Sequence, residues 1–171
     1  QTYGGDTMQY TCSYSSPLGE MLIASDGNAV TGLWFIGQKY FGSTLEAEYA
    51  EKALPIFGQT VRWLDDYFQG NVPMEMPPVS FNSSSFRIRV WKLLMEIPYG
   101  HTVTYGEIAR TLEKQTGRRI CAQAVGGAVG HNPVSIIVPC HRVIGSNGLT
   151  GYAGGLDKKL ALLRLEGVNV H

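Results

Sequence analysis

The sequence predicts an α+β fold, in which an antiparallel sheet with helices is followed by a mostly helical part that contains a helix-turn-helix. Short apolar or alternating runs joined by turn residues fill the first part of the chain, whereas helical periodicity dominates the second. Between them, residues 70–85 are rich in Pro, Ser and Asn, which is typical of a linker. We therefore expect two domains, residues 1–80 and residues 81–171.

Three runs near the N-terminus predict strands that pair as an antiparallel meander. Residues 10–15, "YTCSYS", alternate in polarity, and residues 20–26, "EMLIASD", form a short apolar run. An Asp-Gly-Asn turn signal then leads into "AVTGLWF" at residues 29–35. Residues 1–7 precede Met8, which can serve as the natural start, so we expect them to be an expression-tag remnant or a disordered arm.

Two helices are expected between these strands and the linker. Thr44 can cap a helix that carries Leu45 and Tyr49. Pro55 fits the first turn of a second helix, because its missing N–H is not needed there, and Gly70 ends that helix. The apolar stripe of the second helix consists of Ile56, Trp63, Leu64, Tyr67 and Phe68.

Four helices are expected in the second part of the chain. The first, residues 86–97, follows a serine cap and has one apolar face. The next two, residues 104–113 and 118–130, are joined by a short turn that contains Gly, and such a pair in a basic domain is typical of a helix-turn-helix. The last helix is residues 156–166. Its expected inward side chains are Leu156, Leu160 and Leu163.

Charge is distributed unevenly along the chain. Residues 1–81 hold three basic and nine acidic residues, and residues 82–171 hold eleven basic and five acidic ones. The basic half predicts a module that binds a polyanion, and the alternative is ordinary solvated surface charge. No stretch approaches the roughly 20 apolar residues of a membrane span, so we expect no membrane partner.

The three cysteines, Cys12, Cys121 and Cys140, are too few and too scattered for a disulfide framework, which favours a reducing compartment. No clustered Cys and His pattern predicts a metal site. Cys12 in an expected strand and Cys121 in an expected helix have no nearby histidine, and we expect both to be structural.

Cys140 lies in "PCHRV", where its neighbours favour chemistry over the role of a packed core thiol. Pro139 interrupts a regular strand ladder at this point. His141 is a candidate base, because the nucleophile is the thiolate rather than the thiol. Neighbouring side chains on a strand point to opposite faces, so a contact between the two needs a turn or a bridging water. Glu166, in the last helix, is the best acid of the basic half to orient the imidazole.

The expected helix at residues 118–130 is unusually rich in small residues. Glycine inside a helix costs about 1 kcal/mol relative to alanine, so Gly126 and Gly127 indicate a close approach. That approach is either tight helix packing or contact with DNA, with Arg118 and Arg119 positioned to bind phosphates. Asn132, which follows the helix, can hold a turn by hydrogen bonding to the backbone.

Four motifs together resemble the O6-alkylguanine-DNA alkyltransferases, also called methylated-DNA–protein-cysteine methyltransferases. These motifs are "TYGEIA" at 104–109, "VGGAVGHNP" at 125–133, "PCHRV" at 139–143 and "GYAGGLDKKLALLRLEG" at 151–167. The resemblance is specific over residues 86–167. It is looser over residues 8–81, where "SPLGEML" and "GLWF" fit the ribonuclease-H-like N-terminal domain of the family. Short loops and sparse cysteines resemble its bacterial members.

The resemblance implies direct DNA repair by a single-turnover reaction without a cofactor or a metal. A monomer would bind double-stranded DNA with the second helix of the helix-turn-helix in the minor groove and flip the alkylated guanine into a pocket. The cysteine then takes the alkyl group from O6, and activity on O4-alkylthymine is a further option. We expect a cytoplasmic protein of a bacterium or archaeon, or a nuclear one in a eukaryote.

The resemblance also implies a role for each matching residue. Cys140 matches the alkyl acceptor, His141 its base through a water, and Glu166 the acid that orients His141. Tyr105 matches the proton donor to guanine N3 that also aids flipping, and Asn132 matches the support of the active-site turn. In the substrate pocket, the carbonyls of Cys140 and Val143 match those that bind the exocyclic amine of guanine. Tyr152 and Ala153 match the loop that lines the pocket. The residues matching the DNA surface are Arg118, Arg119, Ala122, Gln123, Gly126 and Gly127.

This sequence departs from the family pattern at several positions. Gln123 stands where the family commonly has an arginine that fills the gap left by the flipped base, which predicts weaker and less salt-sensitive DNA binding. Ala153 stands at a frequent serine position, so a hydrogen bond to O6 there would come from the backbone. The loop from Cys140 to Tyr152 is slightly short, and the zinc ligands of some eukaryotic members have no match.

Three other functions remain open on the sequence. A lesion-binding relative without chemistry would lack the cysteine, and a cysteine hydrolase built on Cys140 and His141 would leave the DNA-binding features without a role. A plain DNA-binding regulator fits the helix-turn-helix, but not "PCHRV".

Overall fold

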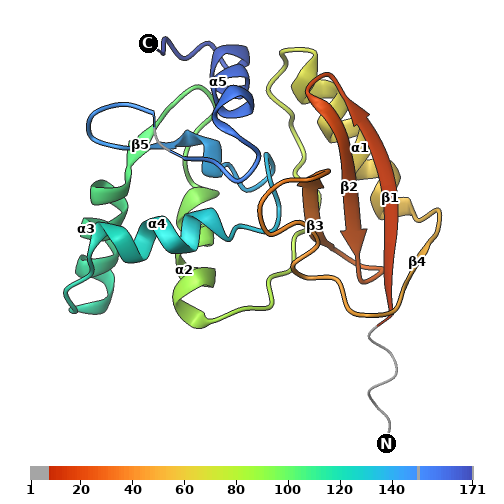
Figure 1. Ribbon diagram of the computed structural model, residues 1–171, viewed down its shortest axis with the longest axis horizontal. Coiled ribbons are helices and arrows are strands. Elements are labelled where there is room, and N and C mark those ends of the chain that lie inside the picture. The colour runs from red at the N-terminus through yellow and green to blue at the C-terminus, as the bar shows by residue number, and fades with distance from the viewer. Residues whose placement is uncertain (1–7, 150, 171) are drawn as a thin grey trace, which may run out of the picture.

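The first three strands form the predicted antiparallel meander in the computed structural model, which describes residues 8–149 and 151–170 (Figure 1). They are β1 (Gln9–Ser16), β2 (Gly19–Ser25) and β3 (Val30–Phe35). The short β4 (Tyr49–Glu51) pairs parallel with β1, so the sheet order is β3-β2-β1-β4. Residues 1–7, the expected tag remnant or arm, lie outside the described residues.

The prediction of a helix after Thr44 is wrong, because the segment contains no helix. Turns lead from β3 to β4, and the Thr44 hydroxyl donates a hydrogen bond to the carbonyl of Thr31 at 2.9 Å instead of capping a helix. The Gln9 side chain bonds the Thr44 carbonyl at 2.9 Å and the Glu46 amide at 2.8 Å. A side chain of β1 thus satisfies the backbone groups of this segment, which therefore needs no helix to pair them.

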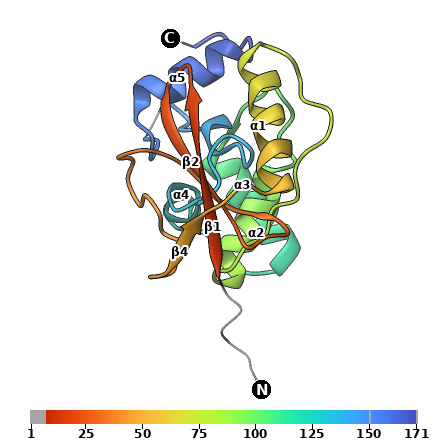
Figure 2. The same ribbon diagram turned by 90° about the vertical axis from the view of Figure 1, so that its right-hand side faces the viewer.

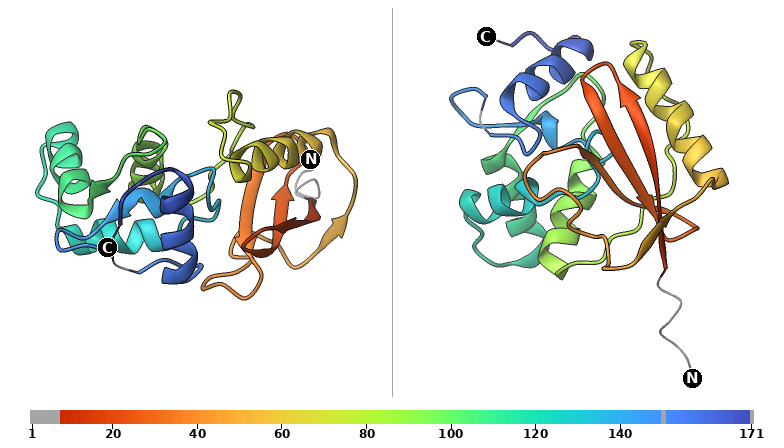
Figure 3. Two further views of the ribbon diagram at one scale, coloured as in Figure 1. Left: turned by 90° about the horizontal axis from the view of Figure 1, so that it is seen from above. Right: turned by 45° about the vertical axis from the view of Figure 1, so that its right-hand side comes forward.

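Helix α1 (Pro55–Phe68) covers one face of the sheet, as Figures 2 and 3 show. Pro55 begins the helix, as predicted. The buried side includes Trp63, Leu64 and Tyr67 of the predicted stripe, and Tyr67 has no exposed surface. One face of the helix therefore points toward the rest of the protein and fixes the direction of the Tyr67 side chain.

The second part of the molecule is mostly helical, as predicted. It contains α2 (Ser85–Leu94), α3 (Tyr105–Thr116), α4 (Ala122–Gly130) and α5 (Leu156–Leu165), with a two-stranded parallel pair of β5 (Val103–Thr104) and β6 (Val143–Ile144). Ser84 caps α2, and Thr104 with Glu107 forms a capping box at the start of α3. These caps set the first turn of α3, where Tyr105 lies.

Helices α3 and α4 form the helix-turn-helix, and α4 is shorter than predicted. Gly117 ends α3 at φ 71°, a left-handed conformation that favours glycine. Residues 118–121 belong to the connecting segment, so the helix expected from residue 118 begins at Ala122. The side chain of Cys121 makes no cap hydrogen bond, and Trp91 of α2 anchors the other end through the Ala128 carbonyl at 2.8 Å.

The inward face of α5 differs from the prediction. Leu156 is 49% exposed and Leu160 is only partly buried, whereas Leu163 is fully buried as expected. The face that points inward instead carries Lys159, Leu162, Leu163 and, just beyond the helix, Glu166. These positions have the helical spacing i, i+3, i+4 and i+7, and a search for apolar residues alone misplaced the face because its two end positions are charged.

The two parts of the chain share one hydrophobic core. Strand β3 continues its pairing into the second part, because the Leu33 amide donates to the Pro133 carbonyl at 2.8 Å and the Ser135 amide donates to the Leu33 carbonyl at 2.9 Å. The sheet thus holds the segment just after Asn132 in place. Figure 1 shows β3 as the strand of the sheet next to α4.

None of the helices within residues 8–149 and 151–170 is long and apolar enough to cross a bilayer.

Candidate active site

Cys140 lies at the start of a single 3₁₀ turn, η2 (Cys140–Arg142). Pro139 precedes it with φ −81° and ψ 65°, and the strand β6 begins directly after the turn. The chain therefore turns at Cys140. A turn was one of the two arrangements, with a bridging water, that could link Cys140 to His141. Cys140 is 6% exposed, and His141 has no exposed surface.

Asn132 holds the segment that leads to Cys140. Its Nδ2 donates to the carbonyl of Val138 at 2.8 Å, and its Oδ1 accepts from the Val134 amide at 3.0 Å. Within this short loop Ile136 adopts φ 69°, an unfavourable conformation for a β-branched residue that the surrounding bonds maintain. The amide of Asn132 thus closes the loop that positions the thiol, which is the place predicted for it.

The surroundings of Cys140 shift the pKa of its thiol in both directions. Burial raises its pKa, whereas a hydrogen bond from the Asn132 side chain and the charge of Lys159 act in the lowering direction. The net direction is upward, so the group rests as a thiol. A base must therefore remove its proton before it can act as a nucleophile.

His141, which directly follows Cys140 in the chain, forms a fully buried pair with Glu166. Nε2 of His141 lies 2.6 Å from Oε2 of Glu166. Burial lowers the pKa of His141, although the carboxylate acts in the opposite direction. A neutral imidazole that donates Nε2–H to the carboxylate keeps Nδ1 as its acceptor, and Nδ1 has no hydrogen-bond partner among the described residues.

Glu166 is bound by several donors at once. Its Oε1 accepts from Arg142 Nε at 2.8 Å and from the Gly100 amide at 2.9 Å. Its Oε2 accepts from Tyr67 at 2.6 Å, in addition to His141. Burial raises the pKa of Glu166, but the hydrogen bond and the charge interaction with His141, with hydrogen bonds from Arg142 and Tyr67, together lower it to about 2. The carboxylate is therefore ionised at neutral pH.

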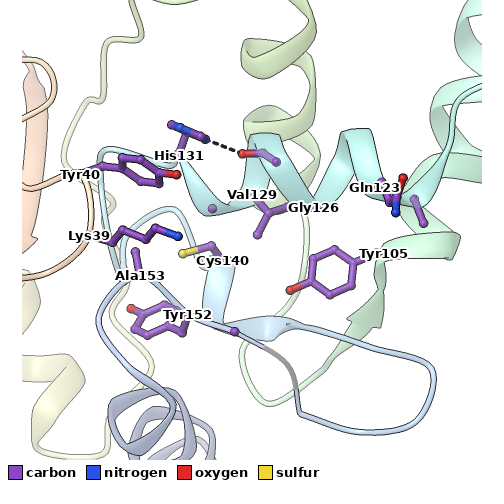
Figure 4. Close-up of a pocket in the computed structure, with 14 residues that line it drawn as sticks. Lys39, Tyr40, Tyr105, Gln123, Gly126, Val129, His131, Cys140, Tyr152 and Ala153 are labelled. Carbon is purple, nitrogen blue, oxygen red and sulfur yellow. Dashed lines mark hydrogen bonds between the residues drawn. The ribbon is translucent and has the colours of Figure 1, made fainter.

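A cavity of about 580 Å³ opens beside Cys140 (Figure 4). Tyr105 lines it on one side, and Tyr152 and Ala153 of the predicted pocket loop line it on another. The helix α4 contributes Gln123 and Gly126. The predicted residues Tyr105, Cys140, Tyr152 and Ala153 are thus brought to one cavity, with the helix α4 at its rim.

The outer surface of α4 is nearly bare. Ala122, Gln123 and Gly127 are exposed. A Cβ added at Gly127 would meet no atom within 4 Å, and one at Gly126 would lie 3.9 Å from the nearest atom, in the Tyr105 ring. These glycines are therefore not required by packing within the protein, and the alternative of tight helix packing loses its support.

Arg118 and Arg119 lie in the connecting segment rather than on α4. Both are exposed, and together with Arg89 of α2 they line a second cavity of about 470 Å³. Their positive charges thus gather at one end of the helix-turn-helix, where they remain able to bind phosphates.

The carbonyl of Val143, predicted to read the guanine amine, accepts a hydrogen bond from Lys159 Nζ at 2.6 Å. Val143 is fully buried and is not among the described residues that line the cavity. A carbonyl oxygen has a second lone pair, so its predicted role stays a prediction. Lys159 is itself fully buried, and burial lowers its pKa to about 8.

Sequence reasoning missed four residues around the site. Tyr67 and Lys159 bind the residues that hold or surround Cys140, and Lys39 and Tyr40 form the cavity wall from the sheet side. The Lys39 amide bonds the Ala153 carbonyl at 3.1 Å, and the Tyr40 ring stacks on His131 at 3.9 Å. Lys159 lies three and four residues before Leu162 and Leu163, and this spacing could have indicated that its side chain points inward. No pattern within α1 distinguished Tyr67 from a core aromatic.

No group of three His, Cys, Asp or Glu side chains within residues 8–149 and 151–170 is arranged to hold a metal ion.

Comparisons with known proteins agree with this geometry. Residues 85–168 match the family model described as 6-O-methylguanine DNA methyltransferase, DNA binding domain, and residues 9–77 match its ribonuclease-like domain. The methylated-DNA–protein-cysteine methyltransferase of Mycobacterium tuberculosis is 44% identical over 152 residues, which cover 88% of each chain. That of Methanosarcina acetivorans is 42% identical over 163 residues, covering 92% of this chain and 98% of the relative.

A crystal structure of the M. tuberculosis protein OGT in complex with DNA has a similar fold. The TM-score is 0.78 at 40% identity, and the match covers 93% of this chain and 92% of that chain. The predicted ribonuclease-like first part and helix-turn-helix second part are both included in these matches. The chain therefore belongs to the methylated-DNA–protein-cysteine methyltransferase family.

Proposed function

We propose that this protein repairs DNA by transferring the alkyl group of O6-alkylguanine to Cys140, once per molecule. The observation that carries the proposal is the position of Cys140. It lines a cavity whose rim is the bare helix α4, and it directly precedes His141, whose buried ring is bound by Glu166. A flipped nucleobase that enters from the side of α4 would meet the thiol. The imidazole of the neighbouring His141 would then accept the thiol proton.

The DNA-bound state follows from the surface of the helix-turn-helix. A minor groove is only about 6 Å wide, and α4 presents Ala122 and Gly127 rather than bulky side chains there. Arg118 and Arg119 would bind phosphates at the start of α4. Gln123, which lines the cavity, would occupy the space that the flipped guanine leaves.

The chemical step begins with the loss of a proton from the Cys140 thiol to Nδ1 of His141, through a bridging water. Glu166 holds the imidazole by accepting its Nε2–H and stabilises the imidazolium that forms. The thiolate then attacks the alkyl carbon, so that the S–C bond forms as the C–O6 bond breaks. Asn132 and Lys159 stabilise the thiolate form, because both act to lower its pKa.

The leaving guanine must receive a proton, because its anion is a poor leaving group. Tyr105, on the cavity wall, would donate its hydroxyl proton to guanine N3 and regain one from the proton that Cys140 released. The backbone of Ala153 would bind O6. The net result is a thioether on Cys140 and an unmodified guanine in DNA. The thioether is not reversed, which limits the reaction to one turnover.

In this proposal the chain divides near residue 80. Residues 81–171 bind DNA and carry the alkyl acceptor, and residues 1–80 support that unit through the β3 contact and the cavity wall formed by Lys39 and Tyr40.

The test is the intact mass of the protein after mixing with a duplex that contains one O6-methylguanine. We expect the mass of one methyl group per protein, located on Cys140 by peptide mapping, and no further reaction with excess duplex. Cys140→Ala should bind the duplex and gain no mass, whereas Cys121→Ala, which removes an exposed thiol, should react as the parent does.

A lesion-binding protein without chemistry would bind the duplex and leave the mass unchanged. A hydrolase would turn over many times and retain a free thiol. Either result would contradict the proposal.

A further inference from the structure

We propose that Tyr67, on α1, is a positioning residue of the alkyl transfer, because its hydroxyl binds the Glu166 oxygen that also accepts from His141. The hydroxyl oxygen lies 2.6 Å from Glu166 Oε2 and 3.4 Å from His141 Nε2. The inference rests on the proposed roles of Cys140, His141 and Glu166. It assigns a part in the reaction to the first, ribonuclease-like part of the chain.

The direction of each hydrogen bond follows from counting donors. An ionised carboxylate only accepts, so both Tyr67 and His141 must donate to Glu166 Oε2. The Tyr67 hydroxyl keeps its proton, since burial and the neighbouring carboxylate raise its pKa. Arg142 Nη2 also donates to this oxygen, at 3.1 Å, so three donors converge on it and restrict where the oxygen and the His141 ring can lie. The geometry leaves Nδ1 as the basic nitrogen of His141.

The hydroxyl is separable from the packing of the Tyr67 ring. The ring stacks on Trp63 with centroids 5.7 Å apart and makes edge contacts with Phe68 and Tyr99. A phenylalanine would retain these contacts. Buried tyrosines usually find some hydrogen-bond partner, so a structural role is the alternative. The two roles differ in what loss of the hydroxyl does to His141.

Sharing of Oε2 limits how strongly Glu166 attracts the His141 proton. When the Tyr67 hydroxyl is removed, more of the carboxylate charge acts on the imidazole, and the pKa of His141 rises. Less neutral imidazole is then present at a given pH to accept the Cys140 proton. The charged and titratable groups around His141 are Glu166, Arg142, Lys159, Tyr67, Tyr99, Cys140 and Tyr152. Of these, Tyr67→Phe alters one hydrogen bond and no formal charge.

The experiment is the single-turnover rate of methyl transfer by Tyr67→Phe, measured against pH with an O6-methylguanine duplex. We expect the acid limb of the profile to move to higher pH by about half a unit, and the plateau rate to fall about three- to tenfold, as for loss of one charge-assisted hydrogen bond.

Tyr14→Phe is the matched control. Tyr14 also donates to a carboxylate, Asp65 Oδ1 at 2.7 Å, in the same part of the chain but with no contact to His141. It should leave both the plateau and the acid limb unchanged. A Tyr67→Phe profile that superimposes on the parent profile, with plateau rates within about twofold, would show that the Tyr67 hydroxyl is only structural.

A second measurement does not depend on the variant folding. Nitrogen NMR of the His141 imidazole in the unsubstituted protein should show the proton on Nε2 and a bare Nδ1 near neutral pH. A proton on Nδ1 would overturn the inference, because Nε2 could not then donate to the shared oxygen. Failure of the unsubstituted protein to transfer methyl would instead reject the proposed function, and the Tyr67 role with it.

Discussion

Nε2 of His141 lies 2.6 Å from Oε2 of Glu166, and neither side chain reaches solvent. The two residues come from different elements, η2 and the end of α5, so the last helix fixes the orientation of the base beside Cys140. Arg142, in the same turn, binds both carboxylate oxygens, at 2.8 Å and 3.1 Å. One buried carboxylate therefore ties α5, η2 and α1 together and also orients the candidate base.

Glu166→Gln should slow methyl transfer at neutral pH by about 100-fold, because general-base assistance of this kind contributes roughly 10² to 10⁴. It should also destabilise the protein by about 3–5 kcal/mol, since Arg142 loses its buried partner. Single-turnover kinetics and urea unfolding would measure these effects. Asp65→Asn, which also alters a carboxylate bound by a tyrosine, should leave the transfer rate unchanged.

The same variant gives a pH prediction. The pKa of Glu166 is about 2 in the folded protein against an ordinary value of 4.5, so its ionised form stabilises the fold. That contribution is complete above about pH 4.5 and is lost as the pH falls toward 2. Part of the parent's acid sensitivity in this range should therefore be absent from Glu166→Gln. Equal slopes of unfolding free energy against pH would contradict this assignment.

Lys159→Met should slow transfer by about tenfold, because Lys159 favours the thiolate form of Cys140 from within a low-dielectric interior.

The pKa of Lys159 itself is lowered to about 8 from 10.5, because burial opposes its charged form. The folded state gains stability relative to the unfolded chain as the pH rises from about 8 to 10.5. This rise should be present in the parent and flatter in Lys159→Met. Lys158→Met is the control for both measurements, because Lys158 is the neighbouring lysine but its Nζ lies over the Phe35 ring.

Most of the fold could be predicted from sequence, because strands and helices with one buried face leave a periodic pattern. The failures have physical causes. The segment after Thr44 is held by Gln9 and Thr31, which lie far away in sequence, so local propensity misassigned it. In α5, the buried charges of Lys159 and Glu166 occupy positions where an apolar pattern places leucines.

The candidate site divides in the same way. Cys140, His141 and Asn132 lie in short motifs that can be recognised from the sequence alone, and the structure brings them together with Glu166 and Tyr105. Tyr67 could not be found, because a tyrosine on an apolar helix stripe looks the same whether its hydroxyl meets solvent or a carboxylate. Its partner lies 99 residues away.

Gln123→Arg should strengthen binding to DNA and make it more dependent on salt. Gln123 is exposed on α4 at the cavity rim and carries no charge. An arginine there adds one cation near the phosphates, so the slope of log affinity against log salt should steepen by about one. Fluorescence anisotropy at several salt concentrations measures the slope. Unchanged affinity and slope would reject the role given to this position.

Gly127→Ala should have opposite effects on folding and on DNA binding. Gly127 lies inside α4, and a Cβ there would meet no protein atom within 4 Å. The free protein should therefore gain about 0.5–1 kcal/mol of stability, the usual difference between alanine and glycine in a helix. If α4 lies against the minor groove, the added methyl group instead meets DNA and should weaken binding.

Gly58→Ala is the matched control for this variant. Gly58 lies inside α1, where a new Cβ would meet only the end of the flexible Arg62 side chain, at 3.4 Å. It should raise stability by a similar amount, because it removes the same backbone freedom, and leave DNA binding unchanged, because α1 lies on the sheet away from α4. Thermal unfolding and duplex binding of both variants separate the two effects. Gly127→Ala with undiminished DNA affinity would show that α4 does not approach the groove at this residue.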